Sequence, residues 1–139
     1  MTRPNAVLLS LALIVVSPGR AAADYFLVNA EQLRSMLNGT RKLLLVDSRT
    51  PAEFEQAHLP RAVNIPADQM QAQASRLPKD KSTAIVFYCR GSGCTLSPAA
   101  ARIASDMGYT NVSVYQAGIP DWLLRGYPVE KGPESSAAR

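Results

Sequence analysis

The sequence is poor in the side chains that most often bind metals. It contains one histidine and two cysteines in 139 residues. A structural zinc site needs four ligands, and Cys89, Cys94 and the distant His58 do not supply them. We therefore expect no metal site, and no pattern in the sequence indicates another cofactor.

The chain also lacks clustered charge and repetition. Its formal net charge is +4 at pH 7, and the basic residues are scattered and not interleaved with aromatic ones. This distribution argues against a nucleic-acid partner. With 47% hydrophobic and 19% charged residues, the composition is that of an ordinary globular chain, and the length suits one domain.

No apolar run is long enough to span a bilayer, which takes roughly 20 residues. The N-terminus instead has Arg3, a continuous apolar stretch over 6–16, and the small-residue site Ala21-Ala22-Ala23. That order is typical of a secretory signal peptide, whereas a buried helix would space its apolar residues along one face. We expect residues 1–23 to be cleaved before Asp24, giving an exported, periplasmic protein without a stable membrane anchor.

From residue 24 onward, short β-rich runs alternate with helical patterns, which favours an α/β domain with a mostly parallel sheet. We expect one domain over 24–132 and a disordered tail over 133–139. The expected strands are 25–28, 43–46, 63–65 and 83–88. The expected helices begin at the capping boxes Asn29 to Gln32 and Thr50 to Glu53, and also cover 67–77 and the stretch from the N-cap Ser97 to Met107.

The strongest strand pattern, 83–88, ends directly on Cys89. A glycine-containing loop follows, and Ser97-Pro98 then indicates a helix start. Open α/β sheets bind ligands at this edge, and a helix N-terminus there lowers the pKa of a thiol and favours the nucleophilic thiolate. The residues expected to bind an anion in this loop are Arg90, Gly91, Ser92, Gly93 and Thr95.

Several segments resemble the signatures of rhodanese domains. The first signature is similar to Asp47-Ser48-Arg49, Glu53-Phe54, His58-Leu59-Pro60 and the stretch 62–66. The second is similar to the stretches 118–122 and 126–129. The resemblance runs from about Asn29 to Val129.

This resemblance implies a single rhodanese-like α/β domain, with a five-stranded parallel sheet and helices on both faces. It also implies a sulfurtransferase in which the cysteine at the position of Cys89 cycles between thiolate and persulfide. The sulfur comes from a small sulfur-containing anion such as thiosulfate and passes to a thiophilic or thiol acceptor. Asp47, Arg49 and His58 are implied as structural support.

The sequence departs from the family pattern at several positions. Ala57, Ala117 and Arg61 stand where glycines are usual. The loop after Cys89 is about two residues longer than usual and contains Cys94. This Cys-x4-Cys form resembles a minority subset of bacterial rhodanese-like proteins.

The role of Cys94 stays open between a disulfide or resolving partner of Cys89 and, less favoured, the sulfur carrier itself. A second hypothesis for the function is therefore a dithiol/disulfide relay that works with a protein reductant or sulfur acceptor. A phosphatase or arsenate reductase is the weakest alternative, because Arg90, directly after Cys89, is the only arginine between Cys89 and Arg102.

Overall fold

The structure is a computed structural model that describes residues 25–135. The predicted signal peptide and the last residues of the predicted tail, 136–139, lie outside the described residues. Within residues 25–135, no helix is long and apolar enough to cross a membrane.

Five parallel strands form one sheet in the order β1-β5-β4-β2-β3. The strands are β1 (Phe26–Leu27), β2 (Leu43–Asp47), β3 (Ala62–Asn64), β4 (Ala84–Tyr88) and β5 (Val112–Tyr115). The helices are α1 (Ala30–Asn38), α2 (Pro51–Gln56), α3 (Leu96–Asp106) and α4 (Gly118–Leu124), with 3₁₀ turns η1 (Ala67–Gln69) and η2 (Ala74–Arg76). The predicted fold class is confirmed.

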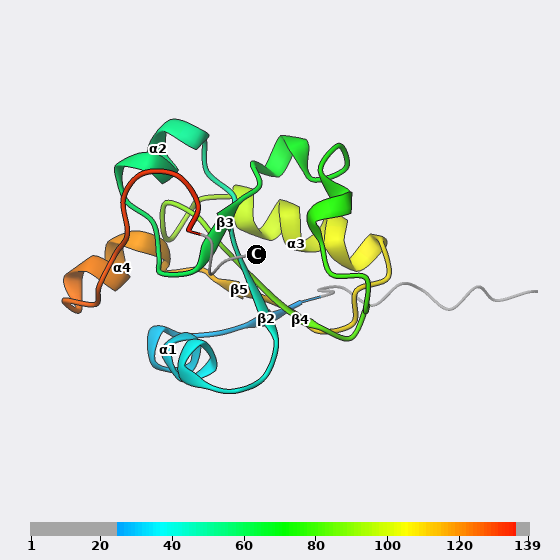
Figure 1. Cartoon of the computed structure of the whole chain (residues 1–139), viewed down its shortest axis with the longest axis horizontal. Coiled ribbons are helices and arrows are strands. Elements are labelled where there is room, and N and C mark those ends of the chain that lie inside the picture. The colour runs from blue at the N-terminus through cyan, green and yellow to red at the C-terminus, as the bar shows by residue number, and fades with distance from the viewer. Residues whose placement is uncertain (1–24, 136–139) are drawn as a thin grey trace, which may run out of the picture.

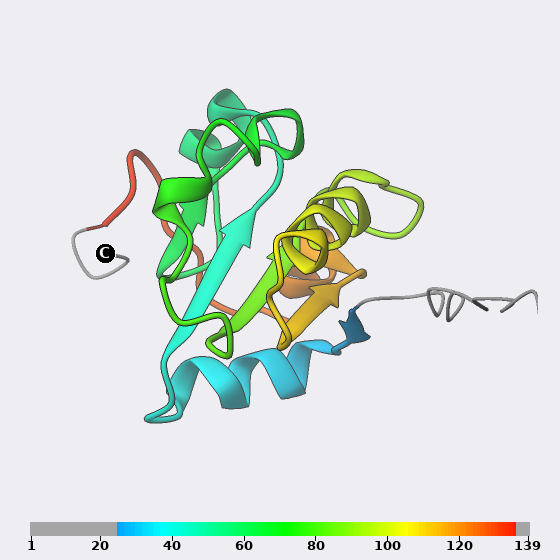
Figure 2. The same ribbon diagram turned by 90° about the vertical axis from the view of Figure 1, so that its right-hand side faces the viewer.

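Helices cover both faces of the sheet, with α3 on one side and α1 on the other (Figures 1 and 2). Along β4, Ile85 and Phe87 belong to the core beneath α3, whereas Val86 and Tyr88 belong to the core shared with α1, α2 and α4. This double covering explains why the central strands are continuous apolar runs. It also leaves the strand ends as the place for a ligand site.

Both predicted capping boxes are present. At α1, the Asn29 side chain accepts from the N–H of Gln32 at 2.9 Å, and the Gln32 side chain accepts from the N–H of Asn29 at 2.8 Å. At α2, Thr50 and Glu53 exchange the same pair of bonds at 3.4 and 3.2 Å. These bonds satisfy the amide groups that a helix start leaves unpaired.

The helix predicted over 67–77 is wrong. The structure has only the 3₁₀ turns η1 and η2 there. Met70 and Leu77 are the only large apolar side chains in the stretch, and both are buried. They would share one helical face, but only the small side chains of Ala67 and Ala74 would lie beside them there, so a helix would bury little apolar area against the sheet.

Two elements, β5 and α4, were not predicted from the residue pattern. β5 is only four residues long, and all four are buried. In α4, Pro120 stands in the first turn, where proline is tolerated, although its proximity to Gly118 suggests a loop when the sequence is read alone.

Two of the three replaced glycines have ordinary backbone conformations. Ala57 and Ala117 have φ of −169° and −65°, which any residue adopts. Arg61 keeps the glycine-like conformation with φ of 65°, the only positive φ of a non-glycine residue within 25–135. Its guanidinium donates to the carbonyl of Leu37 at 2.8 Å, which offsets part of the strain.

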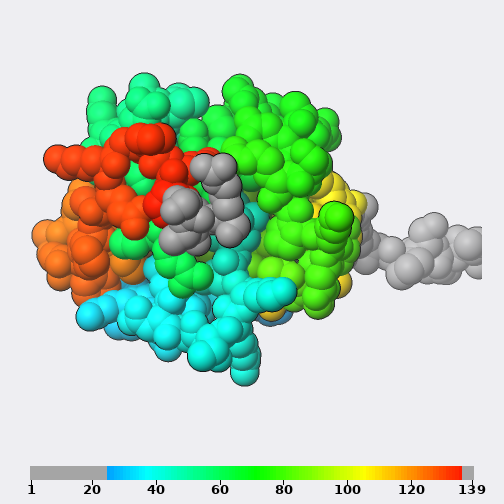
Figure 3. All heavy atoms as spheres, viewed as in Figure 1, coloured from blue at the N-terminus to red at the C-terminus, as the bar shows by residue number. Residues whose placement is uncertain are grey.

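The segment after Val129 lies against α2 and the edge strand β3. His58 and Glu130 exchange two backbone hydrogen bonds of 2.9 Å, and Gly132 donates to the carbonyl of Glu55 at 2.8 Å. Glu134, in the predicted tail, accepts from the N–H of Asn64 at 2.9 Å. In Figure 3 this red segment covers part of the molecule's surface beside the green and teal elements.

Candidate active site

Cys89 lies directly after β4, at the carboxyl edge of the sheet. β4 is flanked by β2 and β5, so the cysteine follows a central strand. Its carbonyl accepts from the N–H of Ile119 at 3.2 Å, and the residue is 1% exposed. The sulfur is therefore held in a protected position at the edge where ligands bind in sheets of this kind.

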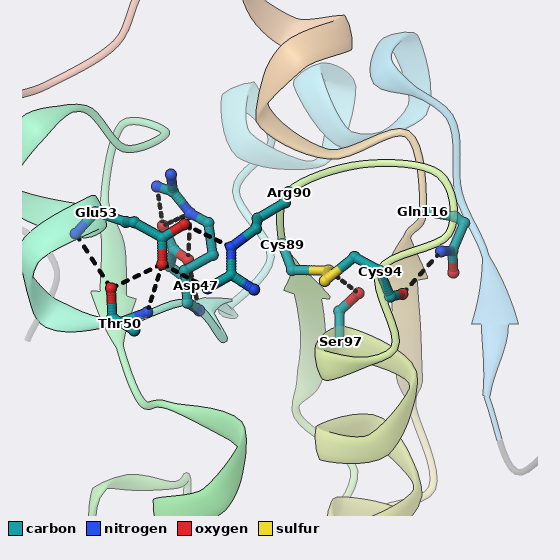
Figure 4. The surroundings of a disulfide bond; sticks show 9 residues. Asp47, Thr50, Glu53, Cys89, Arg90, Cys94, Ser97 and Gln116 are labelled. Atoms are coloured by element: carbon teal, nitrogen blue, oxygen red, sulfur yellow. Dashed lines mark hydrogen bonds and ion pairs between the residues drawn. A yellow bond between two sulfur atoms is a disulfide. The ribbon is translucent and has the colours of Figure 1, made fainter.

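A disulfide joins Cys89 to Cys94, with the two Cα atoms 6.6 Å apart. Gly91 and Gly93 have positive φ of 120° and 87°, and Cys94 donates to the carbonyl of Gly91 at 3.0 Å. These turns bring the two sulfurs together, as Figure 4 shows. Cys94 is half-buried, and its neighbours Gly93 and Thr95 are exposed.

The hydroxyl of Ser97 lies 3.3 Å from the Cys89 sulfur, and Ser97 is fully buried (Figure 4). The predicted role of Ser97 as N-cap is wrong. α3 begins at Leu96, two residues before the predicted first position Pro98, with Thr95 at the N-cap position and no side chain capping the helix. The serine lies one position inside the helix, where its hydroxyl meets the sulfur instead of a backbone amide.

The loop that follows Cys89 has unpaired amides and an open pocket above it. In the part of the chain that the structure describes, the N–H groups of Ser92, Gly93 and Thr95 donate no hydrogen bond. An open pocket of about 370 Å³ lies over the loop and is lined by residues 90–96. Free amides beside a helix N-terminus are suited to an anion or to developing negative charge.

Gly118 fits closely against the active-site loop. With φ of 65°, a Cβ atom here would lie 2.4 Å from the carbonyl oxygen of Cys89 and 2.7 Å from the nitrogen of Gly91. Only glycine permits this approach, so the turn between β5 and α4 supports the loop from behind. The side chain of Gln116 adds a bond of 3.3 Å to the carbonyl of Cys94.

Arg90 points away from the sulfur and toward α2. Its guanidinium makes a forked ion pair with Glu53, at 2.5 and 2.7 Å. The hydrogen bonds from Arg90 lower the pKa of Glu53 to about 2, with Thr50 adding to the effect. The positive charge of Arg90, which was expected to face an anionic donor, is thus paired with the carboxylate of Glu53 in this structure.

Asp47 and Arg49 form a buried ion pair at the carboxyl end of β2, the strand beside β4. The guanidinium of Arg49 donates to both carboxylate oxygens of Asp47 and, at 2.7 Å, to the carbonyl of Ala57. The hydroxyl of Tyr88 accepts from the N–H of Leu59 at 3.0 Å. Burial raises the pKa of Tyr88 well above its usual value, with nearby Asp47 adding to this, so the phenol stays neutral.

His58 contacts α2 and the C-terminal segment. Its Nδ1 lies 2.8 Å from the carbonyl oxygen of Phe54, and the two rings stack with centroids 3.7 Å apart. Its Nε2 lies 3.5 Å from a carboxylate oxygen of Glu130. These contacts join α2 to the C-terminal segment, and none of them involves the cysteine loop.

Sequence reasoning did not assign Glu53, Gln116 or the hydroxyl of Ser97 to the site. Glu53 was identified only as a capping residue, and nothing in the pattern shows that it reaches Arg90. The position of Ser97 one residue inside α3 depends on where the helix begins, and sequence patterns locate helix ends to within a residue or two.

A model of the rhodanese-like domain family matches residues 29–125, so the chain belongs to this family. It is 36% identical over 102 residues to a sulfurtransferase of Allochromatium vinosum, an alignment that covers 73% of this chain and 92% of that protein. It is 38% identical over 118 residues to the HTH-type transcriptional regulator Rv0324 of Mycobacterium tuberculosis, covering 81% of this chain and 50% of the regulator.

Among solved structures, the fold is similar to that of a thiosulfate sulfurtransferase from Pseudomonas aeruginosa, with a TM-score of 0.69 and 28% identity. That match covers 77% of this chain and 20% of the Pseudomonas protein. The chain therefore spans half of the regulator and a fifth of the Pseudomonas enzyme. The family and the sulfurtransferase relatives together support a sulfurtransferase role.

Proposed function

We propose that the protein moves sulfane sulfur as a persulfide on Cys89, from a donor such as thiosulfate to a thiophilic acceptor. The contact between Ser97 and the Cys89 sulfur carries this proposal, since a hydroxyl donor and free loop amides stabilise a thiolate or persulfide anion. The Pseudomonas relative named thiosulfate sulfurtransferase supports the choice of donor.

The reaction has two steps. The Cys89 thiolate attacks the outer sulfur of thiosulfate, and the S–S bond of the donor breaks as sulfite leaves with the electron pair. A thiolate or cyanide acceptor then attacks the outer sulfur of the persulfide, and Cys89 leaves as the thiolate. No net oxidation is needed, and the loop amides balance the negative charge in both steps.

The disulfide must open before this cycle begins, because the nucleophile is a thiolate and not a disulfide sulfur. A dithiol reductant supplies the two electrons. The same disulfide favours the second candidate, a dithiol/disulfide relay in which Cys89 and Cys94 react as a pair.

Steady-state turnover of thiosulfate with cyanide, after reduction of the mature protein, tests the proposal. Cys89→Ser should lower the rate to background, whereas Cys94→Ser should retain turnover and no longer need a reductant. Loss of turnover in both variants would support the relay. Retained turnover in Cys89→Ser would exclude Cys89 as the carrier.

We also propose export to the periplasm, supported by the signal-peptide pattern of residues 1–23 and by the disulfide. Disulfides persist in oxidising compartments and are rare where thiols are kept reduced.

A further inference from the structure

The two sulfurs of the disulfide have different surroundings. Cys89 is 1% exposed and its sulfur contacts the Ser97 hydroxyl. Cys94 is half-buried, and its neighbours Gly93 and Thr95 are exposed along the open pocket. A nucleophile from solvent therefore reaches the sulfur of Cys94 first.

The stability of the leaving group also favours attack at Cys94. When the Cys94 sulfur is attacked, the electron pair of the disulfide moves to Cys89, where Ser97 and the uncapped start of α3 stabilise a thiolate. Exchange is faster when the departing thiolate is the more stable one. Access and charge stabilisation thus both favour attack at Cys94 with departure of Cys89.

We propose that the disulfide form of the protein takes up hydrogen sulfide and converts it to the persulfide on Cys89. In the first step HS⁻ bonds to the Cys94 sulfur and the disulfide bond breaks, leaving a Cys94 persulfide and a Cys89 thiolate. In the second step that thiolate attacks the outer sulfur, and Cys94 leaves as a thiolate. Sulfide is oxidised to sulfane sulfur, the disulfide is reduced, and no other reagent takes part.

The inference rests on the proposed function, because both routes end at the same Cys89 persulfide. It adds sulfide as a second sulfur source, used by the oxidised state rather than the reduced one. An ordinary thiol attacking Cys94 leaves only a mixed disulfide, whereas sulfide leaves a product with transferable sulfur. The free amides of the loop and the open pocket suit a small anion of this kind.

The experiment uses mature protein with its disulfide intact, mixed anaerobically with sodium sulfide and freed of excess reagent. Intact mass spectrometry should show a gain of one H₂S per molecule over the disulfide form. Alkylation and peptide mapping should place the extra sulfur on Cys89. Cys89→Ser and Cys94→Ser cannot form the disulfide and should gain nothing.

Three results would overturn the inference: no reaction, opening to a dithiol without retained sulfur, or sulfur retained only on Cys94. A parallel sample, reduced first and then given thiosulfate, reports on the proposed function separately. Loading by thiosulfate but not by sulfide contradicts this inference alone. Loading by sulfide but not by thiosulfate contradicts thiosulfate as donor and leaves sulfide uptake standing.

Discussion

The hydroxyl of Ser97 contacts the Cys89 sulfur at 3.3 Å in a buried position. A hydrogen bond to an ionised sulfur stabilises it by about 1.5 kcal/mol, which corresponds to about one pKa unit. Ser97→Ala should therefore raise the pKa of the Cys89 thiol by about one unit in the reduced protein. The pH dependence of iodoacetamide alkylation, measured with Cys94 replaced by serine, reports this directly.

Ser113→Ala is the matched control, since Ser113 is a buried serine within β5. It should leave the alkylation profile unchanged. An unchanged profile in Ser97→Ala would show that the hydroxyl does not stabilise the thiolate.

Gly118 and Gly126 share a left-handed backbone but differ in their surroundings. A Cβ at Gly118 would overlap the carbonyl of Cys89, whereas a Cβ at Gly126, with φ of 68°, meets nothing within 4 Å. Gly118→Ala should lower the free energy of unfolding by about 3 kcal/mol or more and reduce turnover, because the clash displaces the loop. Gly126→Ala should lower the free energy of unfolding only by the backbone strain, about 1 kcal/mol, and should retain turnover.

Urea unfolding of both variants with the disulfide intact measures the difference. Equal losses of stability would contradict the close packing of the Gly118 turn on the loop.

At the scale of elements, the structure could be predicted from the sequence where contacts between neighbouring residues determine it. Capping boxes fix the starts of α1 and α2 through bonds among neighbouring residues, so they could be predicted. The 67–77 stretch shows the limit, because its composition permits a helix while its few apolar side chains cannot pack one. The pairing of Glu53 with Arg90 joins residues 37 positions apart and has no local signature.

The ion pair of Glu53 with Arg90 connects α2 to the active-site loop and makes the stability of the protein depend on pH in acid. The pKa of Glu53 is lowered from 4.5 to about 2, chiefly by Arg90. Its contribution to stability is therefore complete above pH 4.5 and is lost as the pH falls from about 4.5 through 2. Because Arg90 is half exposed, the contribution should be less than about 1 kcal/mol.

Glu53→Gln keeps an oxygen for the capping box and removes the negative charge. We expect a stability difference from the unchanged protein at pH 7 that disappears near pH 2, and a KM for thiosulfate lowered about two- to fivefold because Arg90 is freed for the anion. Arg90→Gln is the control and should raise or preserve this KM. If Glu53→Gln leaves the KM unchanged, Arg90 does not reach the donor even when released.

At the scale of the whole molecule, the fold concentrates its chemistry at one edge. Asp47 and Tyr88 end adjacent strands at the edge where the loop begins, and the Gly118 turn packs against the loop. The two apolar layers are distributed over the rest of the domain. Substitutions in the cysteine loop should therefore change reactivity more than stability.

The location of the whole molecule is testable separately. The charged start, short apolar run and small-residue site predict cleavage between Ala23 and Asp24. N-terminal sequencing of periplasmic material should begin at Asp24. Recovery of membrane-bound protein that begins at Met1 would support an uncleaved anchor instead.

The most direct test of the central claim is to locate the transferred sulfur by tandem mass spectrometry after reduced mature protein has reacted with thiosulfate. We predict one added sulfur atom on the peptide that contains Cys89, absent in Cys89→Ser and present in Cys94→Ser. An added sulfur on Cys94 with none on Cys89, or an adduct that survives in Cys89→Ser, would contradict the assignment of Cys89 as the carrier.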